Sequence, residues 1–66
     1  MAKEKFGVAV AKDIAREIDE LVYECEDLGA SRSEIIEAIL TAYIRSDTDH
    51  VEQVRELIIR RRKGTL

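Results

Sequence analysis

The first apolar segment of the chain is Lys5-Phe6-Gly7-Val8-Ala9-Val10-Ala11. Phe6, Val8 and Val10 recur with period two, so the pattern predicts a strand with these three side chains on one face. The rest of the sequence has helical patterns, which leave this strand without a partner in its own chain. Because unpaired strand N–H and C=O groups are unfavourable, we expect the same strand of a second copy to pair with it, antiparallel across a two-fold axis. The sequence therefore predicts a homodimer.

Length and composition agree with a small domain completed by dimerisation. A chain of 66 residues with one cysteine has no intrachain disulfide to support a limited core. Hydrophobic residues make up 45%, charged residues 38%, and there is no proline, a profile typical of a compact helical domain. The sequence shows no signal peptide and no apolar run long enough to span a bilayer, so we expect a cytoplasmic protein with no membrane partner.

Three helices are expected after the strand. The first begins near residues 11–13 and ends at Gly29. The second begins at a capping box formed by Ser31 and Glu34 and covers residues 32–45. It is apolar on almost all sides, so we expect it to pack against its symmetry mate at the centre of the dimer core. The third, over residues 49–63, follows a run of capping residues at 46–49. The apolar positions of the first helix are Ile14, Ile18, Leu21, Val22, Cys25 and Leu28, and those of the third are Val51, Val54, Leu57 and Ile58.

Charge is distributed unevenly along the chain, although its net value is −3. Residues 1–12 carry three lysines and one glutamate, for +2, whereas residues 13–30 carry seven acids and one arginine, for −6. The last helical turn holds Arg60, Arg61, Arg62 and Lys63 together. This basic cluster suits a helix C-terminus electrostatically without any partner, and contact with nucleic acid or a protein is the alternative. Because screening limits each charge to a range of about 8 Å, the local signs matter more than the sum.

The order of these elements resembles the ribbon-helix-helix proteins of the Arc/MetJ/CopG type. The resemblance covers residues 3–45 and is carried by the Phe6/Val8/Val10 alternation, by the apolar positions that follow it, and by the segment Gly29-Ala30-Ser31-Arg32-Ser33-Glu34-Ile35. It implies a mainly α ribbon-helix-helix homodimer, here with an additional C-terminal third helix. Residues 1–46 would form the DNA-binding domain, and residues 47–66 would form a helix and basic tail that pack on it or extend it.

The same resemblance implies where double-stranded DNA would bind. The two paired strands would lie in the major groove, and the N-terminus of each second helix would hold a backbone phosphate. A helix N-terminus supports that role independently, because it offers free N–H donors and a positive dipole end. Glycine and alanine on the strand leave little for base recognition, so we expect affinity to come mainly from phosphates. The implied DNA-binding residues are Lys3, Lys5, Gly7, Ala9, Lys12, Ser31, Arg32 and Ser33.

A DNA-binding transcriptional regulator, such as a repressor, is the function these patterns favour. The alternatives are a protein-binding module, such as an antitoxin whose C-terminal helix binds a partner protein, and a purely structural helical dimer. Catalysis needs a nucleophile beside a base or two carboxylates in a pocket, and the single Cys25 and single His50 lie on different predicted helices. We therefore expect no enzyme activity, no cofactor and no metal site.

Overall fold

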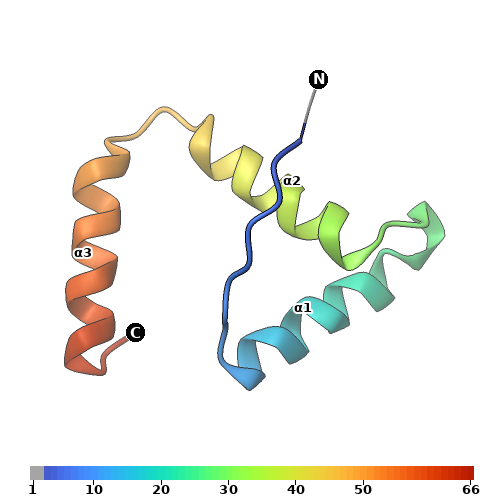
Figure 1. The fold of residues 1–66 in the computed structure, drawn as a ribbon, viewed down its shortest axis with the longest axis horizontal. Helices are drawn as coiled ribbons and strands as arrows, with labels where there is room; N and C mark the ends of the chain where they lie inside the picture. Colours follow the sequence, from blue (N-terminus) through green and yellow to red (C-terminus); the bar gives the residue numbers. More distant parts are fainter. Residues whose placement is uncertain (1–2) are drawn as a thin grey trace.

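The computed structural model describes residues 3–66 and consists mainly of helices (Figure 1). Helix α1 covers Lys12–Glu24, the short 3-10 helix η1 covers Glu26–Leu28, α2 covers Arg32–Ile44 and α3 covers His50–Lys63. The three helices expected from the sequence are therefore confirmed, and α2 and α3 have bounds close to those that the caps indicated.

The predicted strand is not formed in this chain. Residues 3–11 are extended, and the backbone of Ala11 has φ −62° and ψ 150°, but no part of this segment pairs in a β-ladder. A strand requires ladder hydrogen bonds to a second extended segment, and the described residues provide none, because those after residue 11 form helices joined by short turns and loops. The predicted strand is therefore not seen in the single chain, and its pairing with the same segment of a second chain remains a proposal.

The ends of the helices follow local sequence signals. Helix α1 ends at Glu24, earlier than expected, and the chain continues through η1 to Gly29. Gly29 has φ 65°, a left-handed conformation that glycine adopts without steric cost, so it turns the chain between α1 and α2. Asp49 caps α3, because its Oδ1 accepts the backbone N–H of Glu52 at 3.1 Å.

Helices α1 and α2 form the main tertiary contact of the chain. They diverge from the turn at η1 like the arms of a V (Figure 1) and pack together near it. The half-buried side chains of this contact include Ile18 and Val22 on α1 and Ile35 and Ile36 on α2. Ile18 and Val22 are four residues apart, the spacing that brings apolar side chains to one side of a helix, and Ile35 and Ile36 are neighbours near the start of α2.

A corner of polar and aromatic contacts joins α2 to α3. The rings of Tyr43 and His50 meet edge to face, with centroids 4.9 Å apart. His50 Nε2 lies 2.6 Å from the carbonyl oxygen of Tyr43, and the Tyr43 hydroxyl donates to Gln53 Oε1 at 3.1 Å. Beyond this corner, α3 stands away from α1 and α2 (Figure 1).

None of residues 3–66 is fully buried within the chain. Helix α2 shows this most clearly, because Ile39 is 50%, Leu40 49% and Ile44 64% exposed. Phe6, Val8 and Val10 are exposed as well. Large apolar side chains usually dominate the interior of a folded domain. The chain therefore has an apolar surface, centred on α2, that its own residues do not cover.

No helix among the described residues combines the length and the apolar character needed to cross a membrane.

Candidate nucleic-acid interface

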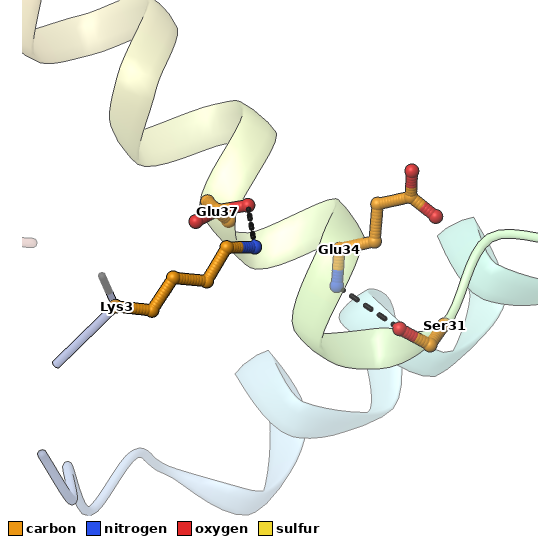
Figure 2. Close-up of polar contacts among 4 residues, drawn as sticks. All are labelled: Lys3, Ser31, Glu34 and Glu37. Atoms are coloured by element: carbon orange, nitrogen blue, oxygen red, sulfur yellow. Dashed lines mark hydrogen bonds and ion pairs between the residues drawn. The ribbon is translucent and has the colours of Figure 1, made fainter. Parts of the chain in front are cut away.

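The N-terminus of α2 has the geometry of an anion site. Ser31 Oγ accepts the backbone N–H of Glu34 at 3.1 Å, as the capping box predicted (Figure 2). The reciprocal bond from the Glu34 side chain to Ser31 is not formed, and the Glu34 carboxylate points away from the cap (Figure 2). The N–H groups of Arg32 and Ser33 belong to the first turn, where a helix has no internal acceptors for them. These donors suit a phosphate oxygen.

Arg32 is engaged by a carboxylate of the same chain. Its Nε lies 2.9 Å and its Nη2 2.6 Å from Oδ1 of Asp19 on α1. The two side chains are 61% and 52% exposed, so solvent reaches the pair. A phosphate at the α2 N-terminus would therefore compete with Asp19 for the Arg32 guanidinium. An exposed pair of this kind is worth roughly 0–1 kcal/mol, which a doubly contacted phosphate can offset.

Lys3 is also paired within the chain. Its Nζ donates to Glu37 Oε1 at 3.1 Å, and the close-up shows this contact and the α2 cap on the same stretch of the helix (Figure 2). Ser31 and Glu37 are six residues apart, which corresponds to about 9 Å along the helix axis at 1.5 Å per residue. The contact holds the start of the extended segment against the first half of α2.

The remaining predicted DNA-binding residues lie on or beside the extended segment. Lys5, Gly7 and Ala9 are all exposed, and Lys12 is the first residue of α1. Within residues 3–66, neither Lys5 nor Lys12 forms an ion pair. A Cβ atom at Gly7 would meet nothing within 4 Å, so the backbone there is open to approach from outside. Of the four cations predicted to bind DNA, Lys5 and Lys12 are thus the two that no carboxylate of the described residues engages.

Two carboxylates of the site, Asp19 and Glu37, escape sequence reasoning. Asp19 belongs to the acidic run of α1, where seven acids look alike, and only the angle between α1 and α2 selects it for Arg32. Glu37 is selected in the same way by the path of the extended segment. Both pairs depend on tertiary packing, and no sequence spacing encodes them.

No group of three His, Cys, Asp or Glu side chains within the described part of the chain is placed to hold a metal ion. His50 contributes to the α2–α3 corner through Tyr43 and also lies 3.2 Å from Ser46 Oγ through Nε2. Cys25 is half-buried at the end of α1.

Comparison of the chain with protein-family models, with curated proteins and with solved structures found no match. The functional interpretation therefore depends on the residues and their geometry.

Proposed function

We propose that the chain forms a homodimer that binds double-stranded DNA and regulates transcription. The homodimer is supported by the exposure of Ile39, Leu40 and Ile44 on α2, a helix that is apolar on almost all sides. Burying apolar surface contributes roughly 25 cal/mol per Å², so a second copy packed on this surface would supply the core that one chain lacks. A two-fold axis through the pair of α2 helices would also let the two extended segments pair as an antiparallel ribbon.

DNA binding is supported by hydrogen-bond donors on the extended segment and at the N-terminus of α2. In a dimer, each protomer would offer Lys5 and Lys12 from the extended segment and the first-turn N–H groups of Arg32 and Ser33. Phosphates of a duplex suit such donors, because cations and helix N-termini are common backbone contacts of DNA-binding proteins. Gly7 and Ala9 provide no donor side chain for base edges, so the proposed complex is held mainly by phosphates.

Salt-dependent binding titrations test this proposal. The affinity for a random duplex and for the gene's own upstream region is measured at several salt concentrations. Each phosphate contact contributes about 0.9 to the slope of log affinity against log salt, and a homodimer loses two contacts per substitution. We therefore expect Lys5→Ala to make the slope shallower by about 1.8.

Lys63→Ala is the matched control, because Lys63 is also exposed but lies at the far end of α3. It should leave the slope unchanged. No binding of either duplex at low salt, or equal slopes for Lys5→Ala and the unmodified chain, would contradict the DNA-binding proposal.

A protein-binding function remains the alternative, and the exposed apolar side chains of α3 favour it. Val51, Leu57 and Ile59 are exposed along this helix. An antitoxin-like module would use α3 to bind a partner protein. If neither duplex binds in the titrations, this alternative becomes the favoured function.

A further inference from the structure

Helix α3 presents an apolar face that its own chain leaves exposed. Val54, Leu57 and Ile58 are 41%, 38% and 42% exposed, although their spacing places them on one side of the helix. The hydrogen bonds that join α3 to α2 lie at the corner of Tyr43 and His50. A face of this kind needs a partner surface.

Two arginines extend this face at the C-terminal end of α3. Arg61 lies four residues after Leu57, and Arg62 lies four residues after Ile58, so helical periodicity places both in line with the apolar side chains. Neither forms an ion pair within the described part of the chain. The surface that covers α3 should therefore combine apolar side chains with carboxylates.

Helix α1 carries a surface of that composition. Ile14 and Leu21 on its apolar side are 45% and 43% exposed. Beside them runs a row of carboxylates in which successive members are four, three and four residues apart, the spacing of neighbours on one helix face. This acidic row consists of Asp13, Glu17, Glu20 and Glu24. Asp19, which pairs with Arg32, lies on the other side of the helix.

The two surfaces match in length as well as in charge. Helix α1 has 13 residues and α3 has 14, so each is about 20 Å long at 1.5 Å per residue. Within one chain, the corner holds α3 apart from α1 (Figure 1). The α1 that α3 can reach is therefore that of another copy.

We propose that α3 docks in trans, with Val54, Leu57 and Ile58 against the exposed apolar side of α1 in a second copy of this chain. Arg61 and Arg62 then lie against the acidic row of that copy. In a two-fold dimer this exchange is reciprocal, so α3 of each protomer packs on α1 of the other. This inference rests on the homodimer of the proposed function and is independent of DNA binding.

Charge reversal tests the exchange, and two variants suffice. One carries Arg61→Glu and Arg62→Glu, and the other carries Glu17→Lys, Glu20→Lys and Glu24→Lys. Each variant alone places like charges at both docked contacts, so its homodimer should dissociate at least about tenfold more readily. When the two are mixed in equal amounts and α3 docks in trans, both contacts between α3 and α1 in the heterodimer become attractive.

Native mass spectrometry of the mixture gives the readout. Random pairing would yield about half heterodimer, and docking in trans should raise that share above about four fifths. Circular dichroism of each variant and of the mixture reports whether the helices are formed, and helicity gained on mixing supports the exchange.

The failures of the inference and of the homodimer are distinguishable. Dimers that mix at random overturn the α3 exchange and leave the homodimer intact. An unmodified chain that is monomeric overturns both. A chain that carries all five substitutions should regain the dimer affinity of the unmodified chain, and failure to do so also contradicts the exchange.

Discussion

Replacing Asp19 with asparagine should strengthen DNA binding. The carboxylate of Asp19 holds the Arg32 guanidinium through contacts of 2.9 Å and 2.6 Å at the point where the phosphate is proposed to bind. Asparagine keeps the shape of the side chain but removes its charge, so Arg32 becomes available to the phosphate. The variant therefore measures the free-energy cost of breaking the ion pair while the shape of the site stays the same.

The size of the effect follows from the exposure of the pair. With side chains 61% and 52% exposed, the pair is worth about 0.2–1 kcal/mol, the range of solvent-exposed pairs. A homodimer breaks two pairs, about 0.4–2 kcal/mol, which corresponds to roughly 2- to 30-fold tighter binding. Fluorescence anisotropy of a labelled duplex at fixed salt measures a change of this size.

Asp27→Asn is the matched control for charge alone. It makes the same change in net charge in η1, and Asp27 forms no ion pair with any described residue. In an Arg32→Ala background, Asp19→Asn should have no more effect than this control. Equal affinities for Asp19→Asn and Asp27→Asn would refute the idea that Asp19 competes with phosphate for Arg32.

Two further substitutions test the fold. Ile39→Asp places a charge on the exposed apolar surface of α2 and should unfold the chain at micromolar concentration. Tyr23→Asp, at a more exposed position on α1, should leave it folded. Circular dichroism compares the two variants, and a folded Ile39→Asp monomer would contradict the shared core. Ser31→Ala removes the acceptor of the Glu34 N–H and should lower the free energy of unfolding by about 0.5–2 kcal/mol, whereas Ser33→Ala should change it by only a few tenths. Denaturant titrations at one protein concentration measure this difference, and equal losses in the two variants would show that the cap does not stabilise α2.

The helices could be predicted because their signals are local. Ser31 and Asp49 each accept a backbone N–H three residues ahead, and Gly29 adopts the left-handed conformation that its position after a helix suggested. The bounds of α2 and α3 follow from these residues directly. The sequence does not predict the end of α1 at Glu24, because η1 extends the apolar pattern as far as Leu28 without continuing the α-helix.

The features that sequence reasoning could not provide depend on distant parts of the chain. The alternation of Phe6, Val8 and Val10 predicts a strand, but a ladder needs a second extended segment, and the described residues of one chain do not supply it. The cations of the candidate site are exposed, whereas the pairing of Arg32 with Asp19 depends on how α1 and α2 pack. The sequence predicts the apolar face of α3, but it does not predict that α3 lies apart from α1 in the chain.

Sedimentation equilibrium of the unmodified chain, combined with circular dichroism over a dilution series, tests the central claim of a shared core most directly. A homodimer built on the exposed apolar surface of α2 should sediment with twice the 7.5 kDa mass of one chain at micromolar concentration. Because the core belongs to both protomers, its helicity should fall together with the dimer fraction on dilution. A helical species of 7.5 kDa that persists unchanged through the series would contradict the account.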